Sequence, residues 1–330
     1  MAGYRYSCYG LTLDSAIPLP DLGPELGTAG TAADVTIRHG SLEAPDPAIV
    51  SPLGLWRRED VCGIEVPDVG RYEARHGTEI VVDPLPGADP RAVRLFLLGS
   101  AMGATMMLRG ALVLHGNAIR VGPEDDPACA VVLGHSGAGK STLAAEFDRR
   151  GFAVLSDDVV PVDATGDALP GYPRIKLWDD ALDRLGRSTD DLERIHDAHE
   201  KFQVPLDRAV LEPLPLRWVF VLERHAGDEL RLEPAQGAVA FALLHEHTYR
   251  NELVLGGAAA ADHLQQCAGL LARARVTRVL RPAATMTAET TAAAILAEID
   301  RDVSPASFPA LSTGLEAGHP SPTASPQECA

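Results

Sequence analysis

The chain has 330 residues, of which 46% are hydrophobic and 23% charged, and its formal net charge is −17. This length suffices for about two domains with buried cores, so a mini-protein or peptide hormone is excluded. The negative charge repels phosphodiester backbones and anionic lipid, which argues against nucleic acid or a membrane as the partner.

Three further features indicate a chain that works inside the cell. The longest uncharged apolar run, residues 95–108, falls short of the roughly 20 residues that span a bilayer, and we expect a buried helix there. The N-terminal residues 1–6 show no apolar signal core behind a basic start. The five cysteines are scattered without a Cys-x-x-Cys pair, which is typical of reduced thiols. We therefore expect a cytoplasmic protein.

The first 90 residues predict a small β-rich N-terminal domain. Short apolar runs separated by Gly and Pro indicate strands at residues 4–9, 35–38, 64–66, 71–75 and 79–82. We find no cluster of titratable groups at a meaningful spacing in this region. The expected role of residues 1–90 is therefore scaffolding or substrate docking.

Residues 91–302 predict a second domain, which begins with a helix. Asp89 followed by Pro90 is typical of a helix start, because the carboxylate caps first-turn amides and the ring is preset for the first turn. The helix should run to about Arg109. Two strands and a hairpin turn are expected next: residues 112–115 and 118–121, joined by Gly116-Asn117.

The following residues predict a strand, a glycine-rich turn, a helix and a second strand. The strands are expected at residues 129–133 and 152–155, and the helix over residues 140–150, with Gly151 as its C-terminal stop. Further elements are expected farther along: strands at residues 217–222 and 275–280, a helix at residues 262–274 and a disordered tail at residues 303–330.

The glycine-rich turn carries the clearest motif in the sequence. Residues 134–141 read Gly-His-Ser-Gly-Ala-Gly-Lys-Ser and match the pattern Gly, any four residues, Gly, Lys, Ser or Thr. Backbone amides of such a loop converge on phosphate oxygens at a helix N-terminus, Lys140 bridges the β and γ phosphates of ATP, and Ser141 ligates Mg²⁺. The predicted nucleotide-binding residues are Gly134, His135, Ser136, Gly137, Ala138, Gly139, Lys140, Ser141 and Thr142.

Two adjacent carboxylates, Asp157 and Asp158, close the strand that follows the loop helix. In doubly wound sheets the carboxyl ends of strands converge on the ligand crevice. One carboxylate there can hold Mg²⁺, and the other can accept a proton from an attacking hydroxyl. The alternative is a pair of solvated acids at a turn.

Three segments in this order resemble the C-terminal domain of HPr kinase/phosphorylase and its relatives, including the serine kinases found with lasso-peptide biosynthesis: residues 114–116, 134–141 and 151–158. The resemblance implies an α/β fold with the P-loop kinase core that also resembles phosphoenolpyruvate carboxykinase. It implies ATP-dependent phosphorylation of serine. It further implies that Asp157 belongs to the metal and phosphate shell, that Asp158 is the general base, and that His115 neighbours the base.

The sequence also departs from this family. The Arg-Gly-Leu-Gly segment that follows the base in the bifunctional enzymes is missing, which puts the phosphorylase reaction and HPr as substrate in doubt. Residues 171–178 stand downstream instead, and the acidic stretch 179–200 is typical of a mobile helix or lid. Four cations are candidate ligands of phosphate or substrate, the alternative being ordinary surface charge: Arg174, Lys176, Lys201 and Arg250.

The leading hypothesis is a Mg²⁺-dependent kinase that transfers the γ-phosphoryl group of ATP to a serine of a peptide or small protein, with Asp158, His115 and Lys140 as catalytic residues. Two alternatives remain: a nucleotide-dependent switch or binding protein, and a kinase of a small metabolite. The sequence does not identify the acceptor. It does not determine the oligomeric state either, and a homo-oligomer is possible.

Overall fold

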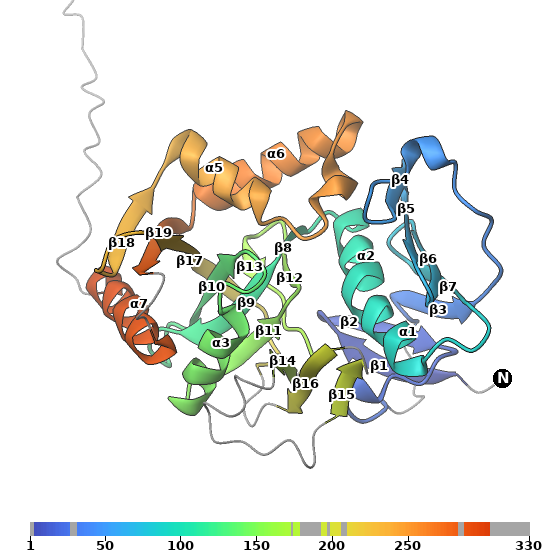
Figure 1. Ribbon diagram of the computed structural model, residues 1–330, viewed down its shortest axis with the longest axis horizontal. Coiled ribbons are helices and arrows are strands. Elements are labelled where there is room, and N and C mark those ends of the chain that lie inside the picture. Colours follow the sequence, from blue (N-terminus) through green and yellow to red (C-terminus); the bar gives the residue numbers. More distant parts are fainter. Residues whose placement is uncertain are drawn as a thin grey trace, which may run out of the picture.

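The computed structural model describes residues 3–26, 32–172, 174–178, 193–196, 199–205, 210–282 and 287–303. In this part of the chain, two large β-sheets lie side by side with helices packed against them, and a small third sheet lies below (Figure 1). The architecture is therefore mixed α/β, which confirms the predicted fold class at this level.

The first large sheet holds seven strands in the order β1-β2-β3-β7-β6-β5-β4. β3 runs parallel to both β2 and β7, and the other neighbouring pairs are antiparallel. The prediction found five of these strands and missed β2 and β4. Their bounds are β1 (Tyr4–Cys8), β2 (Leu11–Ser15), β3 (Val35–His39), β4 (Leu55–Arg58), β5 (Val61–Val66), β6 (Gly70–Arg75) and β7 (Glu79–Pro84), with 3-10 turns at Pro20–Leu22 and Pro47–Ile49.

A continuous helical segment follows, as the sequence predicted. It comprises α1 (Pro90–Phe96), a π-helical segment (Leu97–Ala101) and α2 (Met102–Leu108). The Asp89 carboxylate accepts a hydrogen bond from the amide of Arg91 at 2.9 Å, so the predicted cap is confirmed. The segment ends where Gly110 takes a φ of 85° and the Ala111 amide bonds back to the Met106 carbonyl at 3.0 Å.

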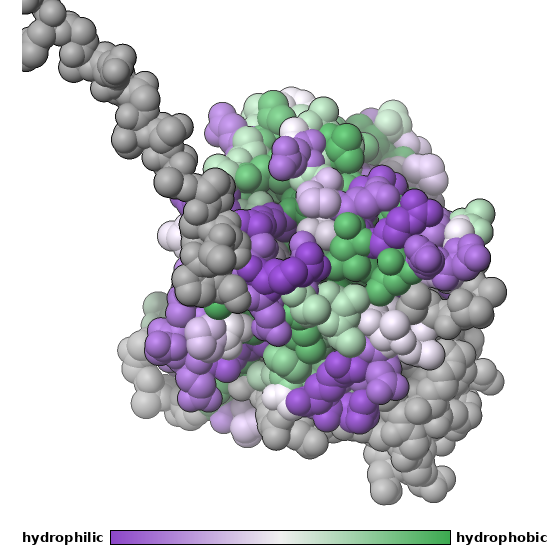
Figure 2. All heavy atoms as spheres, turned by 90° about the vertical axis from the view of Figure 1, so that its left-hand side faces the viewer, coloured by the Kyte–Doolittle hydropathy of each residue, from purple (hydrophilic) through white to green (hydrophobic). Residues whose placement is uncertain are grey.

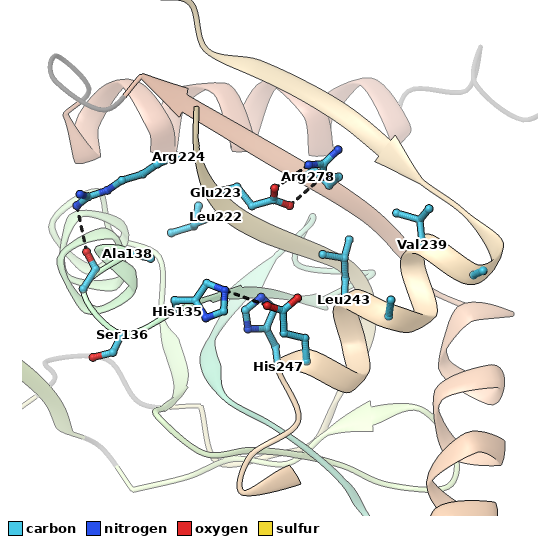
Figure 3. A pocket seen from close by; sticks show the side chains of 14 residues that line it. His135, Ser136, Ala138, Leu222, Glu223, Arg224, Val239, Leu243, His247 and Arg278 are labelled. Atoms are coloured by element: carbon cyan, nitrogen blue, oxygen red, sulfur yellow. Dashed lines mark hydrogen bonds and ion pairs between the residues drawn. The ribbon is translucent and has the colours of Figure 1, made fainter. Parts of the chain in front are cut away.

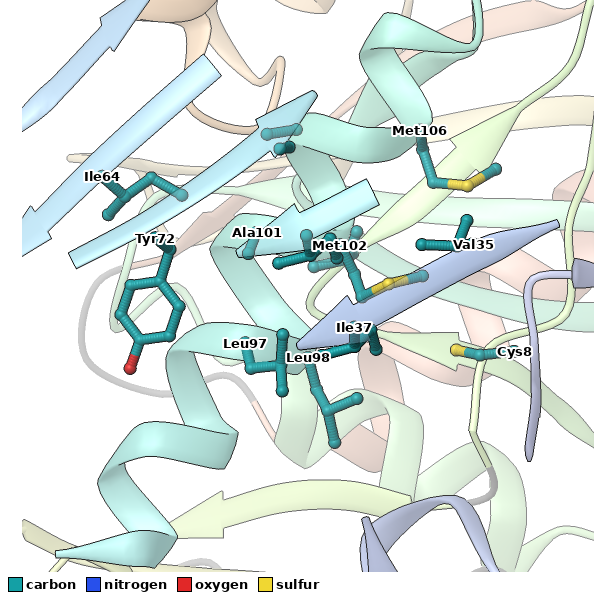
Figure 4. Packing of buried hydrophobic residues seen from close by; sticks show 14 of the residues in the cluster. Cys8, Val35, Ile37, Ile64, Tyr72, Leu97, Leu98, Ala101, Met102 and Met106 are labelled. Atoms are coloured by element: carbon teal, nitrogen blue, oxygen red, sulfur yellow. The ribbon is translucent and has the colours of Figure 1, made fainter. Parts of the chain in front are cut away.

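One face of this helical segment packs into the first sheet (Figure 4). Leu97 and Met102 are fully buried there beside Ile37, and each such side chain contributes about 1.5–3 kcal/mol. Among the described helices, Pro90–Leu108 alone is long and apolar enough to cross a membrane, with a mean hydropathy of 1.2, yet 72% of that window is buried in the protein. The sheet and this helical segment share one hydrophobic core, although the predicted boundary between the two domains, at residue 90, lies between them. That domain boundary stays a prediction.

The second large sheet has nine strands. Seven follow the order β11-β9-β10-β17-β13-β12-β8, while β19 pairs with β17 and β18 pairs with β19. Their bounds are β8 (Leu112–Leu114), β9 (Gly116–Val121), β10 (Ala128–Gly134), β11 (Val154–Asp157), β12 (Val160–Val162), β13 (Asp167–Ala168), β17 (Leu214–His225), β18 (Arg231–Ala235) and β19 (Arg275–Pro282).

The hairpin turn predicted at Gly116-Asn117 is wrong. β8 pairs with β12, and β9 pairs with β10 and β11, so the two strands on either side of His115 are not partners. Gly116 is the first residue of β9. A Cβ at this position would lie 2.4 Å from the carbonyl oxygen of Val132, so the close approach of β10 requires the glycine there.

Helices cover both faces of the second sheet. α3 (Lys140–Arg149) and α7 (Ala288–Val303) pack on one face, and α5 (Gly237–Glu246) and α6 (Gly257–Leu271) pack on the other (Figure 1). A 3-10 turn, Asn251–Val254, lies between α5 and α6. Gly151 ends α3 as predicted: its φ is 92°, and the next amide, of Phe152, bonds back to the Phe147 carbonyl at 3.0 Å.

The third sheet has the order β14-β16-β15. Its strands are β14 (Arg174–Trp178), β15 (Glu193–His196) and β16 (His199–Pro205). The described residues of the acidic stretch 179–200 therefore form strands, and the predicted helix is wrong for them. Residues 179–192 and 197–198, and the predicted tail from residue 304 onward, lie outside the described residues.

Candidate functional site

The glycine-rich motif forms the loop between β10 and α3. β10 is completely buried between β9 and β17, and it ends at Gly134. Gly134, Gly137 and Gly139 have φ values of 150°, 76° and 89°, which side-chain-bearing residues rarely adopt. A Cβ on Gly134 would also meet the Leu222 carbonyl oxygen at 3.0 Å. Backbone conformation therefore explains all three glycines, and close packing in addition requires a glycine at position 134.

Lys140, the first residue of α3, folds back over the loop. Its Nζ donates hydrogen bonds to the carbonyl oxygens of Gly134 at 2.6 Å and His135 at 3.3 Å. The N-cap residue, Gly139, supplies no side-chain cap, so it leaves the first-turn amides of α3, including those of Ser141 and Thr142, to outside acceptors. The loop thus combines an ammonium group with a helix N-terminus, an arrangement that favours anions.

Two arginines from the second sheet donate hydrogen bonds to backbone carbonyls of the loop. Arg224 at the end of β17 donates to the Gly137 carbonyl at 3.4 Å, and Arg281 at the end of β19 donates to the Ala138 carbonyl (Figure 3 shows Arg224). Burial lowers the pKa of Arg281. Neither arginine was singled out in the sequence, because each lies more than 80 residues beyond the loop that it contacts.

Sheet topology brings the acidic pair to the loop. β9 runs antiparallel to both β10 and β11, so the carboxyl ends of β10 and β11 lie at the same edge of the sheet. At this edge Leu133 faces Gly116, and Asp157 faces Asn117. His115, just before β9, belongs to the same edge. The predicted convergence of strand ends is therefore present, although the strand between them is antiparallel.

The two carboxylates have different surroundings. Asp157 is buried, with 6% of its surface exposed, and its Oδ1 accepts a hydrogen bond from Nδ2 of Asn117. Asp158 is partly exposed and has a φ of 75°, in the left-handed region. This conformation turns the chain sharply between the two residues, so the second carboxylate faces a different environment from the first.

Asp158 and the start of the loop line one cavity of about 320 Å³. Of the predicted site residues, its wall contains His115, Gly134, His135, Ser136, Asp158 and Arg250. Four further wall residues were not predicted from the sequence: Glu246, the last residue of α5, and His247, Thr248 and Tyr249, which follow it. The other predicted residues that the structure describes are not part of this wall: Gly137, Ala138, Gly139, Lys140, Ser141, Thr142, Asp157 and Arg174.

His115 contacts Asp158 directly. Its Nδ1 lies 3.1 Å from the carbonyl oxygen and 3.3 Å from the carboxylate Oδ1 of Asp158. Burial lowers the pKa of His115, the Asp158 carboxylate opposes this effect, and the charges of Lys140 and Arg250 add to it. Because a carbonyl oxygen only accepts hydrogen bonds, the neutral imidazole carries its proton on Nδ1 and presents Nε2 as an acceptor.

Arg250 is held at the cavity by Ser100 and Tyr249. Its Nε and Nη2 donate to Ser100 Oγ at 3.2 and 3.0 Å, and its guanidinium carbon lies 5.4 Å from the Tyr249 ring centroid. The Tyr249 ring in turn contacts that of His115, with centroids 5.7 Å apart. Ser100 lies in the π-helical segment, and such segments frequently occur at functional sites.

A second, larger cavity of about 1010 Å³ lies beside the loop and shares His135 and Ser136 with the first (Figure 3). Its apolar wall consists of residues from β17 and α5, among them Leu222, Val239 and Leu243, and the Glu223–Arg278 ion pair at 2.7 Å borders it. Apolar surface also gathers between hydrophilic groups on the side of the molecule where β18 and α7 lie (Figure 2). A concave, mostly apolar cavity with few polar groups is the usual form of a small-molecule site.

The remaining predicted cations lie in the third sheet. Arg174 begins β14, and its backbone pairs with Pro205 of β16. The backbones of Lys176 and Lys201 belong to β14 and β16, but their side chains lie outside the described part of the structure. Arg174 lines neither cavity, and the side chains of the two lysines are not placed, so the proposed roles of these three residues stay predictions.

The predicted magnesium ligands offer a suitable donor set. Asp157 supplies a carboxylate and Ser141 a hydroxyl, and Mg²⁺ prefers hard oxygen ligands of this kind. The hydrogen bond from Asn117 fixes the orientation of the Asp157 carboxylate, which is typical of residues that support a metal ligand. The residues present therefore fit Mg²⁺.

Comparison with protein-family models and with curated proteins gives no match. Among solved structures, the chain is similar to the HPr(Ser) kinase/phosphatase from Coxiella burnetii, with 12% sequence identity and a TM-score of 0.27. The similarity covers 57% of this chain and 90% of that one. It gives the chain a distant structural neighbour and assigns neither a family nor an activity.

Proposed function

We propose that the protein is an ATP- and Mg²⁺-dependent kinase that phosphorylates a serine hydroxyl of a peptide or small protein. The observation that carries this proposal is the shared cavity wall, in which Asp158, His115 and Arg250 face the first residues of the phosphate-binding motif. A phosphate-binding loop alone would fit many nucleotide-binding proteins. A carboxylate beside it, in the same cavity, favours phosphoryl transfer to a hydroxyl.

The triphosphate would bind at the loop. The first-turn amides of α3 and the ammonium of Lys140 provide positive charge for the β and γ phosphates, and Lys140 would exchange its bonds to the Gly134 and His135 carbonyls for phosphate oxygens. Ser141 and Asp157 would hold Mg²⁺, which supplies charge neutralisation at the phosphates. The larger, apolar cavity beside the loop would accept the nucleoside.

Asp158 would act as the general base. Its carboxylate takes the proton of the serine hydroxyl while the hydroxyl oxygen forms a bond to the γ phosphorus, and the bond from that phosphorus to the β–γ bridging oxygen breaks to release ADP. His115 orients Asp158 through its Nδ1. Arg250, fixed by Ser100, would bind the transferred phosphoryl group or the acceptor.

The test is phosphoryl transfer from ATP labelled at the γ position to serine-containing peptides. We expect Asp158→Asn to reduce the rate by about 100-fold or more and to leave ATP affinity nearly unchanged, because the base acts only in the transfer step. Lys140→Met should instead weaken ATP binding. Asp126→Asn, which changes an exposed acid paired with Arg217, is the matched control and should behave as the wild type. Equal transfer rates in Asp158→Asn and wild type would rule out this role.

The size of the smaller cavity supports a second candidate, a kinase of a small metabolite. A volume of about 320 Å³ is at the lower end of the range typical of small-molecule sites. The same labelled ATP, supplied with hydroxylated small molecules and with peptides in parallel, distinguishes the two acceptors. If label appeared only in small molecules, the acceptor would be a metabolite and not a peptide. The proposed roles of the catalytic residues would stay the same.

A further inference from the structure

Three potential metal ligands meet where the phosphate-binding loop approaches the end of α5. They are His135 of the loop, Glu246, the last residue of α5, and His247, which follows it. One donor atom of each lies within 4.8 Å of the other two, and in the described part of the chain this is the one group of three such ligands. In the sequence, His135 stands out only as a residue of the motif, and no local pattern singles out the other two.

The contacts within the cluster already resemble those around a metal ion. Nε2 of His135 lies 3.0 Å from Oε1 of Glu246, and the rings of His135 and His247 have centroids 5.1 Å apart (Figure 3). Two ligands of a tetrahedral zinc ion, each about 2.0–2.2 Å from the metal, lie about 3.4 Å from each other. The cluster therefore needs only a small contraction to surround an ion.

The structure explains how this contraction can occur. His247 is buried, with 5% of its surface exposed, and its backbone is fixed because its carbonyl accepts a hydrogen bond from the His115 amide at 2.8 Å. The side chains of His135 and Glu246 are 72% and 49% exposed, so they can rotate toward the fixed imidazole. His247 is thus held in place, and the side chains of His135 and Glu246 can rotate toward it to complete the site.

The position of the cluster suggests what a bound ion would contact. His135, Glu246 and His247 line both the cavity of Asp158 and the larger apolar cavity, so they lie where the two meet. Three protein ligands leave one position of a tetrahedral ion open. An oxygen of a bound phosphate or carboxylate could occupy that position beside the loop.

We propose that His135, Glu246 and His247 form a binding site for a divalent transition-metal ion of the zinc class, with one coordination position open to the two cavities. Two imidazoles and one carboxylate favour such ions over Mg²⁺, which prefers oxygen ligands only. The site is separate from the Mg²⁺ ligands Ser141 and Asp157. The proposal does not depend on the proposed kinase activity, because the ligands and their geometry are independent of ATP.

The test measures metal binding by the whole, tag-free protein without nucleotide. We expect Zn²⁺ to bind with a stoichiometry of one in calorimetry, and Co²⁺ to give the visible absorption of a four-coordinate site. His135→Ala and Glu246→Gln should each weaken Zn²⁺ binding by at least about 100-fold, since even partners that only support a ligand are worth up to that factor. Both positions are exposed, so both variants should fold, which circular dichroism and the melting temperature check.

A matched control uses a second histidine–carboxylate contact. His76 contacts Asp60 on the first sheet, and no third ligand joins them among the described residues. His76→Ala should bind Zn²⁺ as the wild type does. Absence of Zn²⁺ binding in the wild type, or equal binding in wild type and His135→Ala, would overturn the proposal and leave His135 and Glu246 as a simple ion pair.

Discussion

Nδ1 of His115 lies 3.1 Å from the carbonyl oxygen of Asp158 and 3.3 Å from its carboxylate. The imidazole therefore holds both the backbone and the side chain of Asp158, whose φ of 75° lies in the left-handed region that few residues other than glycine, asparagine and aspartate adopt. This contact joins the residue before β9 to the residue after β11. It makes His115 a positioning residue for the proposed base.

The first prediction concerns how His115 positions Asp158. His115→Ala should lower kcat by about 10- to 100-fold with little change in the KM for ATP, because the carboxylate of Asp158 loses its orientation. His115→Asn should recover most of that loss, since the amide nitrogen can donate to Asp158 in place of Nδ1. Steady-state kinetics of the two variants are the measurement. If His115→Asn were as slow as His115→Ala, Nε2 would have a direct role in the reaction.

The second prediction compares two glycines of the loop. Both have positive φ values, so alanine at either position is strained by about 1–3 kcal/mol. A Cβ at Gly134 would in addition meet the Leu222 carbonyl oxygen at 3.0 Å and the Ala138 Cβ at 3.1 Å, whereas a Cβ at Gly137 meets nothing within 4 Å. Gly134→Ala should therefore lower the free energy of unfolding more than Gly137→Ala, as urea denaturation can show. Equal losses would mean that the loop relaxes away from β17.

The third prediction concerns pH. His263 of α6 is 3% exposed, and its Nε2 lies 2.8 Å from Thr248 Oγ1. Burial, together with the nearby ring of His245, lowers the pKa of His263 below its usual value of 6.5. Between 6.5 and that lowered pKa the unfolded chain binds a proton that the folded chain does not. Stability is therefore complete above pH 6.5 and decreases as the pH falls, by at most about 1.4 kcal/mol per pH unit for this group.

His263→Gln tests this assignment. Other buried histidines with lowered pKa values, His115 among them, contribute to the wild-type slope with the same sign. The variant should therefore flatten the dependence of the unfolding free energy on pH below 6.5 without abolishing it. Urea denaturation at several pH values measures the slope. An unchanged slope would show that His263 is protonated equally in both states.

Local sequence signals were sufficient for much of the fold. The cap at Asp89, the glycine that ends α3 and the apolar runs of β10 and β17 each depend on neighbours within a few residues, and the structure has all of them. The error at Gly116-Asn117 has a different origin. A glycine followed by asparagine is typical of a turn, and only the distant strand β10 shows that the glycine is needed for close packing.

The candidate site was predicted only in part, because local sequence signals identify some of its residues and distant packing brings in the others. Residues 134–158 are close in sequence, and their order along a strand–loop–helix–strand unit indicated which strand ends would meet. The segment after α5 reaches the cavity, and Ser100 reaches Arg250, through tertiary packing, and a single sequence has no signal for those contacts. Arg250 was identified only as a weak candidate, and the Ser100 contact that fixes it is visible only in the structure.

The fourth prediction concerns a buried hydroxyl in the core that contains both the first sheet and Tyr249. Tyr9 is 1% exposed and packs in the same core cluster as Tyr249, and its hydroxyl has no hydrogen-bond partner among the described residues. The charge of Asp158 contributes to the raised pKa of Tyr9, which indicates that the two groups are near each other. Tyr9→Phe removes an unsatisfied polar group and should leave stability unchanged or increase it slightly.

Tyr72→Phe is the matched control for this prediction. Tyr72 is equally buried, but its hydroxyl donates to the Val93 carbonyl at 3.1 Å, so its loss should lower the free energy of unfolding by about 1 kcal/mol. Urea denaturation of both variants compares a bonded with an unbonded hydroxyl in one core. A loss in Tyr9→Phe as large as that in Tyr72→Phe would show that the Tyr9 hydroxyl does bind a partner in solution, and Asp158 would then be the first residue to test, in the double variant with Asp158→Asn.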